Sequence, residues 1–159
     1  MVSGCVITEE CTMVVSADQM WKVACSGDAL QKACAAIIDT VEEKGDGGPG
    51  SITTLTLSAA AGGSLLTSRV VVRDHASRVL RNEILEGGKV SCQLKSQVTE
   101  VKLEEAEEGT CIAKFKVEYE RLDGSGALAP EDQAELIGGY IGMLKAVEAY
   151  LIANPAEYA

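Results

Sequence analysis

The middle of the chain alternates between apolar and polar residues, a pattern typical of β-strands with one buried and one exposed face. The alternation is clearest in residues 110–121, where Ala113, Phe115, Val117 and Tyr119 fall on one face and Lys and Glu residues on the other. Turn-forming sequences separate the segments. Strands are predicted over six segments that can be read directly, namely residues 8–15, 51–57, 65–73, 79–85, 89–104 and 110–121.

Two short helices and one long helix are predicted around these strands. Ser16 stands at an N-cap position and Gln19 at the capping-box position, so a first helix starts here. Gly27 is expected to end it, and a second short helix fits residues 28–36. Pro130 opens a helix of about 24 residues with apolar side chains at helical spacing. At ~1.5 Å per residue this helix spans about 36 Å, the length of a small domain.

The expected order is one strand, two short helices, six strands and a long helix, in a single domain over residues 1–159. This order predicts an α+β fold of the helix-grip kind, a seven-stranded curved antiparallel sheet around the C-terminal helix. A strongly curved sheet cannot fill its own concave face, so the long helix must lie across it. Gly138, Gly139 and Gly142 lie inside that helix, and their missing side chains either leave space or allow close approach of another backbone.

The charge of the chain narrows the range of partners. A formal net charge of −10, from 24 acidic and 14 basic residues, repels nucleic-acid phosphates and anionic membranes. Residues 1–10 do not resemble a targeting signal, and no segment is expected to reach the roughly 18 apolar residues of a membrane helix. We therefore expect a monomeric cytoplasmic protein, with the nucleus left open as a second compartment, and neither membrane nor nucleic acid as partner.

The six cysteines form no C-x-x-C pair and the chain has a single histidine, so no zinc site is expected. A reducing cytosol keeps such thiols free, and most are expected to be small buried apolar residues. The sequence thus predicts neither a metal nor a cofactor.

Three segments together carry a family resemblance. They are the loop with Gly45, Gly47, Gly48 and Gly50 ahead of Ser51-Ile52, the turn Leu85-Glu86-Gly87-Gly88, and the end of the chain over residues 146–158. Together they resemble the birch-pollen-allergen family, the plant pathogenesis-related class 10 proteins, and in particular its grass members. The similarity runs from about residue 8 to residue 159 and includes the order of elements.

The resemblance implies a helix-grip fold with a large internal cavity and a defence or stress role. Relatives bind cytokinins, flavonoids, fatty acids and sterol-like compounds, so a small hydrophobic plant metabolite or hormone is the expected partner. Two alternatives stay open: a ribonuclease or metabolite-condensing enzyme, and hormone signalling through inhibition of a protein phosphatase, as in the abscisic-acid receptors. The phosphatase alternative needs a mobile gate, for which residues 58–64 are the candidate.

The ligand-binding residues are expected on the inward face of the strands and of the long helix. The set is Leu55, Leu57, Leu66, Val70, Leu80, Thr99, Val101, Phe115, Val117, Tyr119, Tyr140 and Met143. Each also fits an ordinary core position, and alternation alone does not show a hollow interior. Leu80 and Asn82 stand where relatives often carry tyrosines, which suggests a ligand less dependent on phenol hydrogen bonds.

The catalytic inventory is incomplete. Glu148 and Tyr150 match the C-terminal pair of the ribonuclease proposal for the family, but its loop lysine is missing and Lys95 stands at the position of its strand glutamate. A condensing enzyme needs an inward lysine. Alternation points Lys114 outward. Lys95 is placed on the inward face of its strand with Gln97 and Thr99, but that face is polar and the pattern does not fix its phase. We expect binding rather than catalysis.

Three further features have two interpretations each. The glycine loop is interpreted as a rigid hairpin connection, with a weak backbone anion site as the alternative. The cluster of Arg69, Arg73, Arg78 and Arg81 is interpreted as a solvated face that balances nearby acids, with a patch for an anionic ligand as the alternative. His75 is interpreted as a surface turn residue and not as a catalyst.

Overall fold

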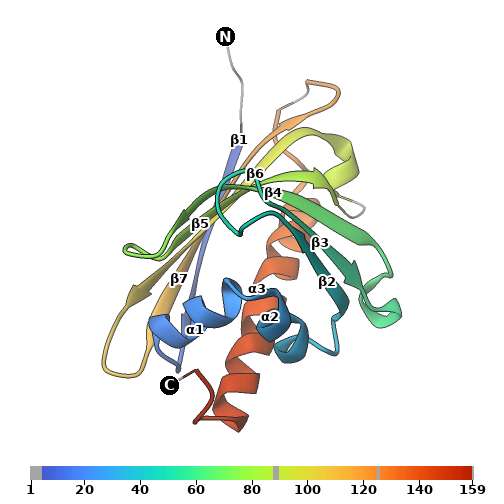
Figure 1. Cartoon of the computed structure of the whole chain (residues 1–159). Coiled ribbons are helices and arrows are strands. Elements are labelled where there is room, and N and C mark those ends of the chain that lie inside the picture. The colour runs from blue at the N-terminus through green and yellow to red at the C-terminus, as the bar shows by residue number, and fades with distance from the viewer. Residues whose placement is uncertain (1–4, 88–89, 125, 159) are drawn as a thin grey trace.

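The computed structural model describes residues 5–87, 90–124 and 126–158. Seven antiparallel strands form one sheet in the order β1-β7-β6-β5-β4-β3-β2, and the long helix α3 runs across its concave face (Figure 1). The strands are β1 (Cys5–Met13), β2 (Ile38–Lys44), β3 (Ile52–Leu57), β4 (Leu65–Asp74), β5 (Val79–Glu86), β6 (Leu94–Glu105) and β7 (Cys111–Arg121). The helices are α1 (Ala17–Ala24), α2 (Gly27–Ala33) and α3 (Pro130–Ala153), with short 3-10 turns η1 (Ala59–Ala61) and η2 (Ser91–Gln93). The predicted fold class and element order are confirmed.

Strand β7, which lies between β1 and β6, shows why the sheet has two distinct faces. Its buried and partly exposed residues alternate along the strand, as the sequence predicted. On the outer face Lys114 Nζ lies 2.7 Å from Glu104 Oε1 on β6, and Arg81 on β5 pairs with Glu118. These exposed pairs contribute little to stability. They make the outer face polar and solvated, while the inner face is apolar.

The two short helices start at serine caps. Ser16 Oγ accepts the Gln19 backbone N–H at 3.1 Å, which confirms the predicted start of α1. The second helix differs from the prediction of residues 28–36, because it begins at Gly27 and ends at Ala33. Ser26 Oγ accepts the Ala29 N–H at 3.2 Å. This cap draws Gly27 into the first turn of α2, so the glycine does not merely separate the two helices.

Several strand boundaries also differ from the prediction. β1 covers Cys5–Met13 and not residues 8–15, and no separate prediction covered β2, whose apolar residues are few. Of the predicted strand over residues 89–104, residue 89 lies outside the described residues. The rest is not one strand, since η2 precedes β6 and the β6–β7 register shifts between Leu94 and Ser96. This shift leaves Lys95 exposed while Gln97 and Thr99 are buried. Lys95 therefore does not share their inward face.

Helix α3 provides the apolar surface that the sheet grips. Leu136, Ile137, Val147 and Leu151 are buried, and further apolar residues of the helix pack half-buried against the core. By length and composition, α3 alone among the helices of the described residues could cross a membrane, so the expectation that no segment reaches this limit was wrong. In the fold α3 lies across the concave face of the sheet (Figure 1), and these apolar residues belong to the core cluster or pack against it.

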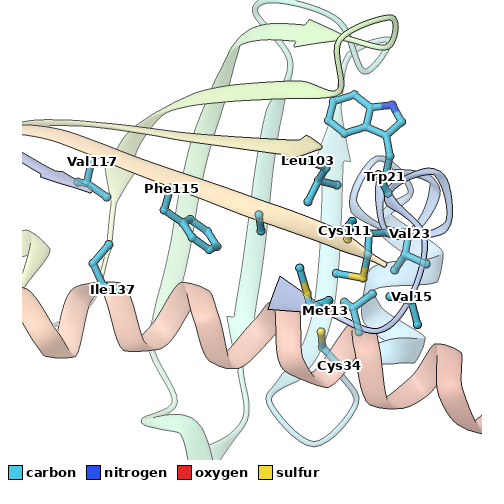
Figure 2. Packing of buried hydrophobic residues seen from close by; sticks show 14 of the residues in the cluster. Met13, Val15, Trp21, Val23, Cys34, Leu103, Cys111, Phe115, Val117 and Ile137 are labelled. Atoms are coloured by element: carbon cyan, nitrogen blue, oxygen red, sulfur yellow. The ribbon is translucent and has the colours of Figure 1, made fainter. Parts of the chain in front are cut away.

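The solid part of the core lies at the end of the sheet where α1 and α2 cross α3. Met13, Met20, Val23, Cys34 and Cys111 are almost completely buried there. Figure 2 shows this sulfur-rich cluster between the end of β7 and the helix, with Phe115 and Ile137 farther along the interface. Because this end is closed by packed side chains, free volume is found along the rest of the concave face.

Candidate functional site: a cavity with two chambers

Two adjoining chambers lie between the sheet and α3. The outer chamber has a volume of about 470 Å³ and the inner one about 160 Å³. Both are lined by Leu66 on β4 and by Tyr140 and Met143 on α3, so these three side chains form the partition. Together the chambers provide a concave, mostly apolar site of the kind that holds small molecules.

The outer chamber opens at the N-terminal half of α3. Its wall includes Leu57, Val90 and Leu136, and the segment with Ala61 and Gly62 borders it. Gly139 contributes no side chain, and a Cβ atom added there would meet nothing within 4 Å. The absence of a side chain at this position therefore keeps the chamber open. The predicted gate, residues 58–64, contains η1 and lies at this mouth.

The inner chamber has an aliphatic and aromatic wall with a polar edge. Its apolar lining includes Leu30, Val41, Leu55, Leu80, Val101 and Phe115. Its polar lining consists of Glu43, Thr53, Ser68, Arg73, Asn82 and Thr99. The chamber could thus bury an apolar body and orient it through a small number of polar contacts.

Tyr140 connects the partition to the sheet by hydrogen bonds. Gln97 Nε2 donates to its hydroxyl at 3.0 Å, and Thr99 Oγ1 donates at 3.1 Å. Burial raises the pKa of Tyr140, while these two hydrogen bonds act in the opposite direction. The phenol is therefore neutral at physiological pH and acts as a fixed polar point inside an apolar wall. Its ring also lies 6.2 Å from the ring of Phe115, centroid to centroid.

The structure brings most of the predicted ligand-binding residues to these chambers. Nine of them line one or both chambers, namely Leu55, Leu57, Leu66, Leu80, Thr99, Val101, Phe115, Tyr140 and Met143. Whether they contact a ligand stays a prediction. Alternation identified the strand residues among them, because it assigns residues to the correct face of the sheet, whereas Tyr140 and Met143 lie on α3.

The other three predicted residues line neither chamber. Val117 is fully buried in the packed core. Tyr119 is also buried, and its hydroxyl accepts the Leu128 N–H at 2.9 Å, which fixes the segment before α3. Val70 is buried outside the main apolar cluster, and its backbone pairs with the glycine loop. Alternation does not distinguish the solid parts of the concave face from its hollow parts.

Sequence reasoning missed the polar edge of the inner chamber. Arg73 was considered only as part of a charged cluster, and Asn82 only as a departure from relatives, while Glu43 and Ser68 were not considered. A register shift between Val70 and Val72 changes the phase of β4, so Arg73 lines the chamber. No alternation pattern could have shown this, because the bulge itself is not visible in the sequence.

The two ribonuclease candidates make contacts that hold elements together. Glu148 Oε2 accepts the Val14 N–H at 2.7 Å, and Glu148 Oε1 lies 3.2 Å from Lys145 Nζ. The Tyr150 hydroxyl donates to Glu157, and Lys32 Nζ lies 5.7 Å from the centre of the Tyr150 ring. Glu148 and Tyr150 thus attach α3 to the end of β1 and to the C-terminal segment, and neither lines a chamber.

The glycine loop uses its own N–H groups internally. Gly47 N–H donates to Ser51 Oγ, Gly48 N–H to Asp46 Oδ1, and Gly50 N–H to Val70 O. Gly45 has φ of +114°, and a Cβ there would lie 2.6 Å from Ser51 Oγ. With these donors occupied and a carboxylate already in place, the loop fits a rigid connection better than an anion site.

The remaining charged candidates are mostly paired. Arg69 bonds Glu83 at 2.8 Å, Arg81 contacts Glu100 and Glu118, and Arg78 lies 4.0 Å from Asp18. Arg73 differs from these three, because its buried Nε atom has no hydrogen-bond partner in the described part of the chain. His75 is exposed, and its Nδ1 accepts the Trp21 Nε1–H at 3.0 Å, so it covers the edge of a buried indole.

Titratable groups elsewhere do not assemble a second centre in the described part of the chain. No group of three or more His, Cys, Asp or Glu side chains suited to a metal ion occurs among the described residues. Burial raises the pKa of Cys34 to about 11, and also that of Cys111 to about 11, so both thiols are neutral and unreactive at pH 7. These two cysteines behave as small apolar core residues, as predicted.

The fold is that of a helix-grip protein, with two chambers between the sheet and the long helix. The chain belongs to the Pathogenesis-related protein Bet v 1 family, which matches residues 1–154. It is similar to the major pollen allergen Bet v 1-C of Betula pendula, with 29% identity and 94% of each chain covered. It is equally similar to pathogenesis-related protein STH-21 of Solanum tuberosum, at 29% identity and 96% coverage of each.

Solved structures agree on the fold. The allergen Ara h 8.0201 has a TM-score of 0.79 at 24% identity, covering 94% of this chain and 99% of its own. Norcoclaurine synthase from Thalictrum flavum, in complex with dopamine and hydroxybenzaldehyde, has a TM-score of 0.68 at 19% identity. That comparison covers 94% of this chain and 87% of the synthase. At these identities the likeness establishes the shared fold and not a shared activity.

Proposed function

We propose that the protein binds a small, mostly apolar molecule in the two-chamber cavity, as a cytoplasmic plant defence or stress protein. The observation that carries this proposal is the pair of adjoining chambers, of about 470 and 160 Å³, between an aliphatic sheet face and α3. Burial of apolar ligand surface supplies the affinity, at roughly 25 cal/mol per Å² before the costs of association. A small metabolite or hormone is the fitting ligand class.

Binding takes precedence over catalysis because the candidate catalytic groups lie away from the cavity. Lys114 pairs with Glu104 on the outer face, and Lys95 is exposed beside Glu120. Among the described lysines none lines either chamber. A condensing reaction needs an inward acid or base close to its substrate, and cleavage of RNA needs a phosphate stabiliser as well. The residues predicted for these reactions, Lys95 and Lys114 for condensation and Glu148 with Tyr150 for RNA cleavage, line neither chamber in the described part of the chain.

A hormone-dependent interaction with a protein phosphatase is the second candidate. Its supporting observation is that the segment 58–64 borders the outer chamber through Ala61, Gly62 and Ser64. Gly62 and Gly63 both have positive φ, which suits a segment that changes conformation. Ligand-dependent inhibition of a phosphatase by the purified protein would support this candidate, and inhibition without a ligand, or none at all, would exclude it.

Titration with N-phenyl-1-naphthylamine, a neutral probe that fluoresces in apolar surroundings, tests the binding proposal. We expect saturable binding to the wild type and about tenfold weaker binding to Gly139→Leu, whose side chain enters the outer chamber. Gly138→Leu is the matched control, because Gly138 is exposed on the same helix and lines neither chamber. Absence of binding, or equal weakening by both substitutions, would overturn the proposal.

A further inference from the structure

We propose that the inner chamber selects ligands with a carboxylate head group, held by Arg73 and Asn82 while the apolar body fills the cavity. This inference rests on the proposed binding function and specifies the class of ligand. A long-chain or ring-bearing carboxylic acid in its ionised form has the required chemistry.

Arg73 is the one cation among the described residues that line either chamber. Its Nε atom is buried and has no hydrogen-bond partner in the described structure, and no ion pair of Arg73 is found there. A Cβ at Gly47 would lie 2.9 Å from Arg73 Nη1, so the guanidinium rests against the glycine loop. The other three arginines of the cluster pair with acids on the outside, and Arg73 is thus distinct from them.

Asn82 supplies a second unused polar group at the same place. Its Oδ1 is buried without a partner, and the residue lines the inner chamber together with Arg73. On the sheet Arg73 is opposite Leu80, so Asn82 is its diagonal neighbour on β5. Diagonal positions are within reach of a long side chain. An amide can turn its NH₂ toward an acceptor, so one carboxylate could accept from both residues.

Physical chemistry favours an anion here over a neutral group. A partly buried guanidinium without an acceptor carries an unrecovered desolvation cost. A carboxylate offers two acceptor oxygens in the planar geometry that guanidinium matches best. Nearby, burial raises the pKa of the Cys25 thiol to about 11, so it is neutral and does not compete for Arg73.

Two acids at the cavity oppose an anionic ligand and determine its orientation. Glu43 lines the inner chamber near α2, and a Cβ added at Gly27 would lie 3.3 Å from its Oε1. Glu135 lines the mouth of the outer chamber. Since Arg73 lies at the glycine-loop edge of the inner chamber, a carboxylate is held there and the apolar body extends past Tyr140 toward the outer chamber.

Competition for bound N-phenyl-1-naphthylamine by dodecanoate and by dodecan-1-ol isolates the head group, because both competitors have the same chain. The quantity compared is the ratio of the two inhibition constants in each protein. In Arg73→Gln we expect the affinity for dodecanoate to fall about tenfold relative to the affinity for dodecan-1-ol, since one charge-assisted contact is removed. Arg69→Gln is the charge-matched control, because Arg69 is exposed and paired with Glu83. Its ratio should stay at the wild-type value.

The outcomes separate this inference from the proposed function. If the neutral probe binds but the ratio is unchanged in Arg73→Gln, or shifts equally in Arg69→Gln, the carboxylate site is wrong and the binding function stands. If the neutral probe binds none of the folded proteins, the binding function itself fails. Circular dichroism melting curves establish that each variant is folded, and retained binding of the neutral probe by Arg73→Gln shows that its cavity is intact.

Discussion

Glu148 is the residue for which a catalytic role and a structural role lead to opposite expectations. Its carboxylate accepts the Val14 N–H at 2.7 Å and pairs with Lys145 at 3.2 Å, and its side chain is 12% exposed. Hydrogen bonds to charged groups contribute about 1.5–3 kcal/mol. Because Val14 lies at the surface, water replaces part of the lost contact. We therefore expect Glu148→Ala to lower the free energy of unfolding by about 2 kcal/mol.

For a domain of this length, about 2 kcal/mol corresponds to a fall in Tm of about 4–8 °C. Urea denaturation and thermal melting measure both quantities, and Glu108→Ala, in the exposed β6–β7 turn, is the control that should change stability by less than about 0.5 kcal/mol. Binding of N-phenyl-1-naphthylamine should be unaffected in both variants. Unchanged stability of Glu148→Ala, together with loss of an RNA-cleaving activity present in the purified wild type, would refute the structural role.

Three further substitutions or treatments test separate parts of the structure. Tyr140→Phe removes the acceptor of the buried Gln97 Nε2 group, while Gln97 Oε1 still accepts from Ser91 Oγ. Urea denaturation should therefore show a loss of about 1–2 kcal/mol in the free energy of unfolding, and increased stability would contradict this. Gly138→Ala should gain about 0.5–1 kcal/mol, because a Cβ there meets nothing within 4 Å; a loss would show an unseen contact. Iodoacetamide at pH 8 should alkylate the exposed Cys92 before Cys34, whose pKa burial raises to about 11. The stability due to protonated Cys34 is complete below pH 9, the ordinary pKa, and is lost as the pH rises to about 11.

The arrangement of sheet and helix could be predicted from patterns that are visible in the sequence itself. The alternation in β7, the serine cap of α1 and Pro130 at the start of α3 are local signals, and each appears in the structure as expected. Boundaries were less accurate where a bulge or a capped glycine decides them. A register shift in β6 leaves Lys95 exposed. The Ser26 cap places Gly27 in the first turn of α2.

The candidate site could be predicted only in part. The alternation of apolar and polar residues shows which side chains face the helix, but it does not show whether the space in front of them is filled or empty. Phe115 and Val117 are two residues apart on the same face of β7, yet the first lines the inner chamber and the second lies in solid core. The role of Arg73 depended on the bulge in β4 and on the paired state of the other arginines. These are relations between strands that no single segment encodes.

The crystal structure of the protein soaked with N-phenyl-1-naphthylamine tests the central claim most directly. We expect the probe to lie between the sheet and α3, in contact with the partition formed by Leu66, Tyr140 and Met143. Probe density on the outer face of the sheet, with both chambers filled by rearranged side chains, would contradict the claim that this protein binds a ligand between its sheet and its long helix.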